Sequence, residues 1–208
     1  MIRHHTAAVL AAALAVFAGS ARAEIKTEWI EYNHGDVKLK GYLAYDDAVS
    51  GKRPAVLVIH AREGMTDNTK KNVEMFARYG YVGFAADIFG YGQGVLPKDV
   101  PEMQAQTTIY NKDRALMKSR AQAGYDALAK HPLADAGKIA LAGYCFGGTV
   151  GVEFGSTGAP LAANIPIHGS FNNHQPGWLP ANEPWIAIVA ASGTPVVANS
   201  APTLPPKQ

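Results

Sequence analysis

The feature that most restricts the fold is a series of short, continuous apolar runs that alternate with segments of helical spacing. The four runs are PAVLVIH at 54–60, YVGFAAD at 81–87, KIALAGY at 138–144 and LAANIPIH at 161–168. Runs of this length are typical of strands that are buried on both faces of a parallel sheet. Because helix-forming segments lie between them, the sequence predicts an α/β fold with a mostly parallel sheet flanked by helices.

The segments between and before these runs predict the other elements. Residues 69–79 repeat apolar positions at helical spacing and stop at Gly80, which predicts a helix. Residues 102–130 are also predicted to be helical, up to His131-Pro132. The stretch 89–101 is rich in glycine and proline and therefore predicts a loop. Residues 24–32 and 37–45 alternate apolar and polar side chains around a cluster of turn-forming residues, which predicts an antiparallel hairpin.

The first 23 residues predict a secretory signal peptide. They begin with the basic segment MIRHHT, continue with the apolar run AAVLAAALAVFA and end in the small-residue segment GSARA. This order is typical of signal peptides, and the apolar run is shorter than the roughly 20 residues that a membrane-spanning helix needs. We therefore expect cleavage after Ala23 and a periplasmic or secreted protein.

The composition of the chain is that of a globular protein with balanced charge. Hydrophobic residues make up 48% of the chain and charged residues 17%, which argues against disorder. Without Arg3 and Arg22, 17 of the 19 basic residues remain, against 17 acidic ones. The expected mature domain is formally neutral, so its composition gives no indication of a nucleic-acid-binding surface.

The segment GYCFGG at 143–148 contains Cys145, the only cysteine of the chain. It lies between a predicted buried strand and a predicted helix, at the sheet edge where reacting groups gather in open α/β sheets. A strand-to-helix turn this sharp strains its central residue, so the residues two positions away must lack bulk, as Gly143 and Gly147 do. The pattern predicts the cysteine form of a nucleophile elbow.

The elbow also predicts how the residues around Cys145 would assist a reaction. The helix that begins after Cys145 favours the thiolate form of the side chain, and the backbone amide of Phe146 can donate to a developing oxyanion. A second donor is expected from the loop after residues 54–60, where the Arg62 amide is the best candidate. The alternative interpretation is a buried structural cysteine in a glycine-rich turn.

The chain resembles the dienelactone hydrolases, a branch of the α/β-hydrolases, over about residues 25–175. The resemblance depends on GYCFGG, on PAVLVIHAREG at 54–64, on GYVGFAADIFGYG at 80–92 and on IPIHGS at 165–170. It implies an α/β-hydrolase-like fold and hydrolysis of small-molecule carboxylic esters or lactones. It also implies a Cys–His–Asp triad with Cys145 as the nucleophile, and neither a metal nor an organic cofactor.

The sequence departs from the family's pattern after the nucleophile, where the family has an aspartate and then a late histidine. No aspartate follows Cys145, and Thr194 stands about where the resemblance places the acid. Only His168 and His174 follow the cysteine, and both come early. We therefore expect impaired turnover, and we favour structural roles for both histidines over the role of a substitute base.

Other polar residues near the predicted strand ends have structural interpretations. Ala61 replaces a glutamate of the family, and Glu63, two positions on, is expected to face elsewhere. Asp87 and His60 end buried strands, where polar side chains usually form hydrogen bonds rather than react. No histidine shows metal-ligand spacing with an acid or the cysteine.

The predicted organisation is a signal peptide at 1–23, a dienelactone-hydrolase-like domain at 24–178 and an atypical proline-rich tail at 179–208. The tail includes a possible strand at 184–192 but no helical spacing, so we expect incomplete C-terminal strand–helix units, through divergence or truncation. Two further functions stay open. One is non-catalytic binding of small acyl or lactone-like ligands, and the other is redox-responsive thiol chemistry through mixed disulfides.

Overall fold

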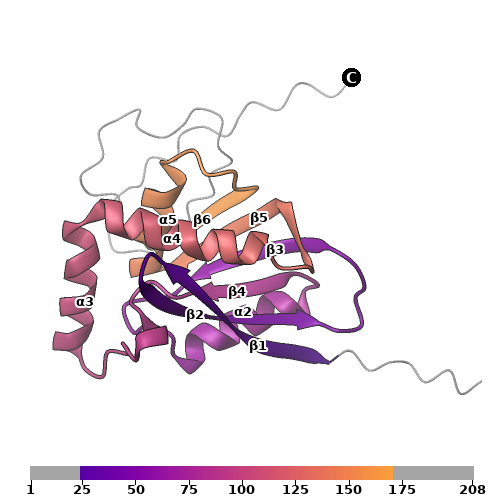
Figure 1. The fold of residues 1–208 in the computed structure, drawn as a ribbon, viewed down its shortest axis with the longest axis horizontal. Coiled ribbons are helices and arrows are strands. Elements are labelled where there is room, and N and C mark those ends of the chain that lie inside the picture. Colours follow the sequence, from indigo (N-terminus) through magenta and orange to yellow (C-terminus); the bar gives the residue numbers. More distant parts are fainter. Residues whose placement is uncertain (1–23, 171–208) are drawn as a thin grey trace, which may run out of the picture.

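Residues 24–170 are described by a computed structural model, in which a six-stranded sheet has helices on both faces (Figure 1). The strands are β1 (Ile25–His34), β2 (Val37–Asp46), β3 (Arg53–Ile59), β4 (Val82–Ala86), β5 (Ala134–Tyr144) and β6 (Ala163–Ile167). The helices are α2 (Asp67–Arg78), α3 (Val100–Lys112), α4 (Arg114–Ala129), α5 (Phe146–Gly155) and the short 3-10 helix η1 (Tyr91–Gln93).

The strands follow the order β1-β2-β4-β3-β5-β6 across the sheet. β3 is parallel to both β4 and β5, and β5 is parallel to β6, whereas the pairs β1–β2 and β2–β4 are antiparallel. The predicted α/β fold with a mostly parallel sheet is confirmed. The predicted signal peptide at 1–23, the boundary at residue 178, the strand at 184–192 and the tail at 179–208 lie outside the described residues.

The predicted N-terminal hairpin is also confirmed. β1 and β2 pair over their whole length, from Ile25 opposite Asp46 to His34 opposite Val37. The two-residue connection begins at Gly35, whose φ of 57° is a left-handed value that suits glycine in a tight hairpin turn. The hairpin joins the parallel strands through β2 and β4 and therefore extends the sheet on the side away from Cys145.

The core lies on both faces of the sheet because the central strand β3 is buried on both. Leu57 and Ile59 pack in one cluster with side chains from α3, α4 and α5. Val56 and Val58 pack on the opposite face with Val73 of α2. Each fully buried aliphatic side chain of this kind stabilises the fold by about 1.5–3 kcal/mol relative to an exposed one. Helices on both faces therefore hold the carboxyl ends of β3 and β5 in place.

The prediction that residues 102–130 are helical is confirmed with one interruption, because the chain forms two helices, α3 and α4, that meet at Asp113. The backbone of Asp113 leaves the helical region, with φ −115° and ψ 85°. Its carboxylate accepts a hydrogen bond of 2.8 Å from the amide of Leu116 and so caps the first turn of α4. The helical character of the sequence on both sides of Asp113 does not by itself reveal the break. The result places α3 at an angle to α4 (Figure 1).

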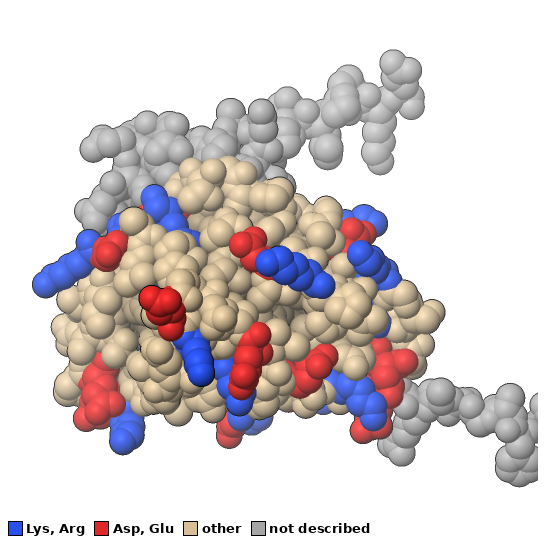
Figure 2. All heavy atoms as spheres, viewed as in Figure 1, with Lys and Arg blue, Asp and Glu red and all other residues tan. Residues whose placement is uncertain are grey.

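Charged side chains of both signs are interspersed on the face of the molecule shown in Figure 2. Among the ion pairs of the described residues, Lys26 with Glu24 at 2.7 Å is exposed on both sides, and pairs of this kind stabilise a fold little. Within residues 24–170, no helix combines the length and the apolar character that crossing a membrane requires.

Candidate active site

Cys145 lies at the turn between β5 and α5 with a strained backbone. Its φ is 54° and its ψ −112°, a conformation that side chains rarely adopt and that costs about 1–3 kcal/mol. Within residues 24–170 only one other residue apart from glycine, His168, has a positive φ. The side chain of Cys145 is partly exposed, and it makes no capping hydrogen bond to α5. The turn therefore presents the thiol, as the sequence predicts for a nucleophile elbow.

The two glycines that flank the cysteine are required by close backbone contacts. A Cβ atom at Gly143 would overlap the carbonyl oxygen of Gly147, and one at Gly147 would overlap the carbonyl oxygen of Ile59. Gly148 is similarly restricted, since a Cβ there would lie 2.7 Å from the amide nitrogen of Gly169. The prediction that these positions must lack bulk is confirmed.

A cavity of about 420 Å³ opens beside the elbow. Its lining comes from five parts of the chain and consists of Arg62, Thr107, Asn111, Arg114, Cys145, Phe146, Thr149, His168 and Ser170. All three site residues predicted from the sequence, Cys145, Phe146 and Arg62, thus lie on the walls of one cavity. Their catalytic and oxyanion-binding roles stay predictions.

The two expected oxyanion donors come from different elements. Phe146 is the first residue of α5, so its amide has no carbonyl one turn earlier in the helix to which it could donate. Arg62 lies in the turn after β3, which is closed by a hydrogen bond of 3.0 Å from the Gly64 amide to the Ala61 carbonyl. Backbone amides on two separate elements are the arrangement that an oxyanion hole uses.

Two arginines line the cavity, and each forms an ion pair with a glutamate. Arg114, at the start of α4, lies 3.3 Å from a carboxylate oxygen of Glu153, which is buried in α5. Arg62 pairs with Glu63 at 3.2 Å, and both of those side chains are about half exposed. Arg114, Thr107 and Asn111 are not predictable from the sequence, because their segments are remote from the elbow and carry no motif.

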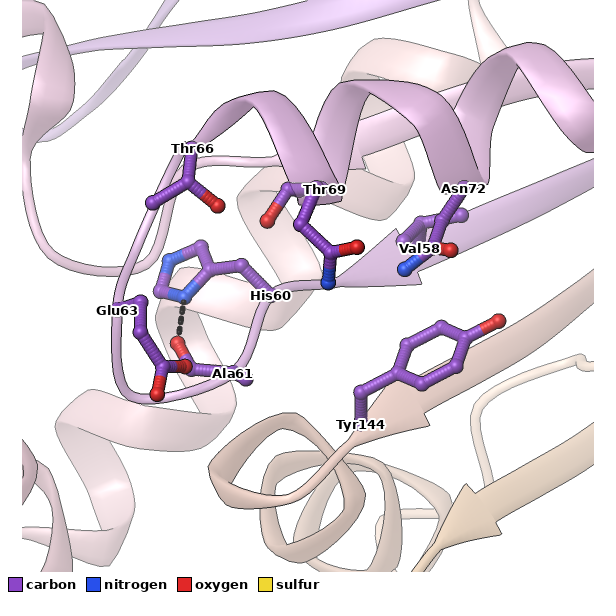
Figure 3. A pocket seen from close by; sticks show the side chains of 9 residues that line it. Val58, His60, Ala61, Glu63, Thr66, Thr69, Asn72 and Tyr144 are labelled. Atoms are coloured by element: carbon purple, nitrogen blue, oxygen red, sulfur yellow. Dashed lines mark hydrogen bonds between the residues drawn. The ribbon is translucent and has the colours of Figure 1, made fainter.

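A second, smaller cavity of about 80 Å³ has a different lining (Figure 3). It is formed by Val58, His60, Ala61, Glu63, Thr66, Asn68, Thr69, Asn72 and Tyr144. Glu63 lines this cavity and Cys145 lines the other one. The expectation that Glu63 faces away from the cysteine is therefore confirmed, and Glu63 does not substitute for a glutamate at position 61.

His60 has a structural environment at the end of β3. Nδ1 donates to the carbonyl of Ala61 at 2.8 Å, and Nε2 accepts from the amide of Ile88 at 3.2 Å, so both ring nitrogens are engaged by the neutral imidazole. Burial of the ring lowers its pKa and keeps it neutral. The structural interpretation of His60 is confirmed.

Asp87 likewise holds a loop together at the end of β4. One carboxylate oxygen accepts from the amides of Gly90 and Tyr91, both at 2.7 Å, and the other accepts from the amides of Gly92 and Lys40. The side chain is fully buried. This network is the role that the sequence predicts, in which the carboxylate binds loop amides.

Of the two histidines that follow Cys145, the structure describes only one. His168 directly follows β6 and lines the cavity of Cys145, whereas His174 lies outside the described residues. Of the part of the chain that the structure describes, no group of three or more His, Cys, Asp or Glu side chains is arranged to hold a metal ion.

Comparisons with known proteins agree with this geometry. The sequence model of the dienelactone hydrolase family matches residues 39–205. Among curated relatives, Protein usf of Aquifex pyrophilus is 26% identical over 146 residues, which cover 68% of this chain and 61% of that protein. The chain thus spans about three fifths of the length of this relative.

Two solved structures are similar to the chain in both fold and sequence. One is a dienelactone hydrolase-like promiscuous phosphotriesterase from metagenomic libraries, with a TM-score of 0.69 and 32% identity over 74% of this chain and 63% of that one. The other is m3DLH, with a TM-score of 0.71 and 30% identity over 79% of this chain and 68% of that one.

Proposed function

The chain belongs to the dienelactone hydrolase family, and on this premise we propose that it hydrolyses carboxylic esters or lactones with Cys145 as the nucleophile. The observation that carries the proposal is the strained backbone of Cys145 at the wall of a cavity. A cysteine that only filled space would need neither the strain nor the access, and backbone strain is concentrated at functional sites.

The proposed reaction begins with attack of the Cys145 thiolate on the carbonyl carbon of the ester. The carbonyl oxygen becomes an oxyanion, which the amides of Phe146 and Arg62 stabilise from two sides. The carbon–oxygen bond of the ester then breaks, the leaving alkoxide takes up a proton, and the acyl group stays on sulfur as a thioester. Water attacks the thioester in a second step, which releases the acid and restores the thiol.

We further propose that the second step is slow in this chain of 208 residues. Residues 146–208 contain no aspartate, and among residues 24–170 His168 is the one histidine that lines the Cys145 cavity. A well-oriented base and acid contributes roughly 10²–10⁴-fold by proton transfer. An imidazole without an aspartate to orient it loses much of that contribution, and hydrolysis of the thioester, which depends on activating water, is affected most.

This proposal predicts burst kinetics with an activated chromogenic ester such as p-nitrophenyl acetate. We expect about one nitrophenolate per chain to be released rapidly, followed by a steady phase slower by roughly 10²-fold or more. Stopped-flow absorbance gives both the amplitude and the two rates. Linear release without a burst, at a rate that exceeds spontaneous hydrolysis, would show that deacylation is not limiting.

We also propose that the protein is exported and that residues 1–23 are removed, on the basis of the basic, apolar and small-residue order of that segment. Expression of the full gene in a bacterial host should yield a periplasmic protein whose intact mass corresponds to Glu24 as the first residue. Recovery of the uncleaved chain from the cytoplasm alone would contradict the proposal.

A further inference from the structure

We propose that His168 is the catalytic base of this chain and exchanges a proton with the thiol of Cys145. The inference rests on the proposed function, because it assigns a second residue to the same reaction. It goes against the structural role that the sequence favours for this histidine, and three observations on the described residues support it.

The first observation is the strand register. β5 and β6 are parallel neighbours in which Tyr144 lies opposite Ile167. Cys145 and His168 are the next residues of the two strands, and neighbouring strands lie roughly 4.8 Å apart. The amide of Cys145 also donates to the carbonyl of Ile167 at 2.9 Å, so the pairing continues to the point where both chains turn. The two residues therefore leave the sheet side by side.

The second observation is that both residues are strained and both face the same cavity. His168 has a φ of 42° and Cys145 a φ of 54°. A positive φ is uncommon in residues other than glycine and turns the side chain away from the direction of a regular strand. Both side chains line the cavity that also contains the expected oxyanion donors. A structural histidine at a strand end needs neither the strain nor the cavity.

The third observation is that the backbone after His168 is fixed rather than loosely placed. The amide of Ser170 donates to the hydroxyl of Thr149 on α5 at 2.9 Å. Between them Gly169 packs directly on Gly148, where no Cβ atom would fit. His168 is thus held between the Ile167 carbonyl on one side and the Ser170 amide on the other, which limits where its imidazole can lie.

In the proposed step, a ring nitrogen of the neutral imidazole accepts the thiol proton as the sulfur attacks the carbonyl carbon. The imidazolium then returns this proton to the leaving oxygen as the carbon–oxygen bond breaks, so the thioester forms with no net gain of protons. In hydrolysis the same nitrogen accepts a proton from water and returns it to the sulfur. No carboxylate among residues 24–170 forms a hydrogen bond with His168, and this is why we expect slow water activation.

The test is single-turnover acylation with two acetate esters, phenyl acetate and p-nitrophenyl acetate, followed by intact mass. The variant is His168→Asn, since asparagine adopts a positive φ more readily than most residues. His34→Asn, which removes an imidazole from the end of β1, is the matched control. The phenolate of phenyl acetate needs a proton more than nitrophenolate does, so a base that returns a proton matters more for phenyl acetate.

We expect the acylation rate of His168→Asn to be roughly 10²-fold lower than that of the parent with phenyl acetate. With p-nitrophenyl acetate the decrease in the acylation rate should be clearly smaller. His34→Asn should match the parent with both. A second variant, His168→Gly, relieves the backbone strain, and free imidazole should restore part of its rate. Equal rates for parent and His168→Asn with both esters would overturn the inference, and so would an equal loss with both esters that imidazole does not rescue.

These outcomes separate the inference from the proposed function. A parent chain that acquires no acetyl group on Cys145 contradicts the proposed function and the role of His168 together. A parent that acylates rapidly while His168→Asn does so equally rapidly contradicts only the role of His168, and points to a base outside residues 24–170.

Discussion

Replacement of Cys145 by alanine should abolish the burst and reduce ester hydrolysis to the spontaneous rate, a loss of at least about 10³-fold in the acylation rate. Alanine keeps the Cβ atom and therefore the same backbone strain at φ 54°, so the elbow itself is unchanged. The loss then reports the sulfur atom alone. Stopped-flow assays with p-nitrophenyl acetate, beside a thermal unfolding curve of the same preparation, measure both properties.

Retention of a burst in Cys145→Ala, with an unfolding transition like that of the parent, would mean that another group forms the acyl intermediate. Thr107, Thr149 and Ser170 are the residues with hydroxyl groups that line the same cavity. Conversion of each to alanine in the Cys145→Ala background would identify that group. We expect all three double variants to be indistinguishable from Cys145→Ala, because none of these residues lies in the strained turn.

The second large effect is on stability, and we expect it from Gly143→Ala. The new Cβ atom would overlap the carbonyl of Gly147 and lie 2.9 Å from the amide nitrogen of Gly148. Both are backbone atoms, so the turn itself must move. We expect the free energy of unfolding to fall by about 3 kcal/mol or more, at the upper end of single substitutions.

Gly137→Ala is the matched control, since Gly137 lies in the same strand and is exposed. A Cβ atom there would meet only the carboxylate of Asp135, at an ordinary distance of 3.5 Å. This variant should unfold within about 0.5 kcal/mol of the parent in urea. If both variants lost the same stability, the tight packing of the elbow would not be what restricts position 143.

The elements that the sequence predicts best are those whose signal is local. The continuous apolar runs correspond to β3, β4, the second half of β5 and β6. β3 and β4 are buried on both faces as predicted, whereas β6 alternates buried and half-buried residues. The elbow is predicted for the same reason, since Gly143 and Gly147 are placed by contacts within a few residues and with the neighbouring strand. Local chemistry is sufficient at these positions.

Other features depend on contacts that the sequence does not display. At the helix break, the carboxylate of Asp113 accepts a hydrogen bond from the amide of Leu116, and nothing in the sequence around it announces this cap. Arg114 reaches the Cys145 cavity only because α4 packs beside α5, which sets its guanidinium 3.3 Å from the buried Glu153. Neither Asp113 nor Arg114 belongs to a sequence motif, so their roles become visible only in the folded structure.

The position of His168 beside Cys145 follows from the register of two strands and not from the separation of the two residues in sequence. In sequence it lies 23 positions after Cys145, too early for the histidine of the family's triad. In the sheet it is the neighbour of Cys145, because β6 pairs with β5 at Tyr144 and Ile167. The adjacency of the two strands was a reasonable expectation, whereas the positive φ of His168 and its place on the cavity wall were not predictable.

The most direct test of the account is the mass of the protein after brief exposure to p-nitrophenyl acetate at moderate excess. We predict one added acetyl group per chain, located on Cys145 by peptide mapping, which persists after the ester is consumed and is absent from Cys145→Ala. Rapid nitrophenolate release without any acetyl group on Cys145, in a chain that remains folded, would contradict the assignment of Cys145 as the nucleophile.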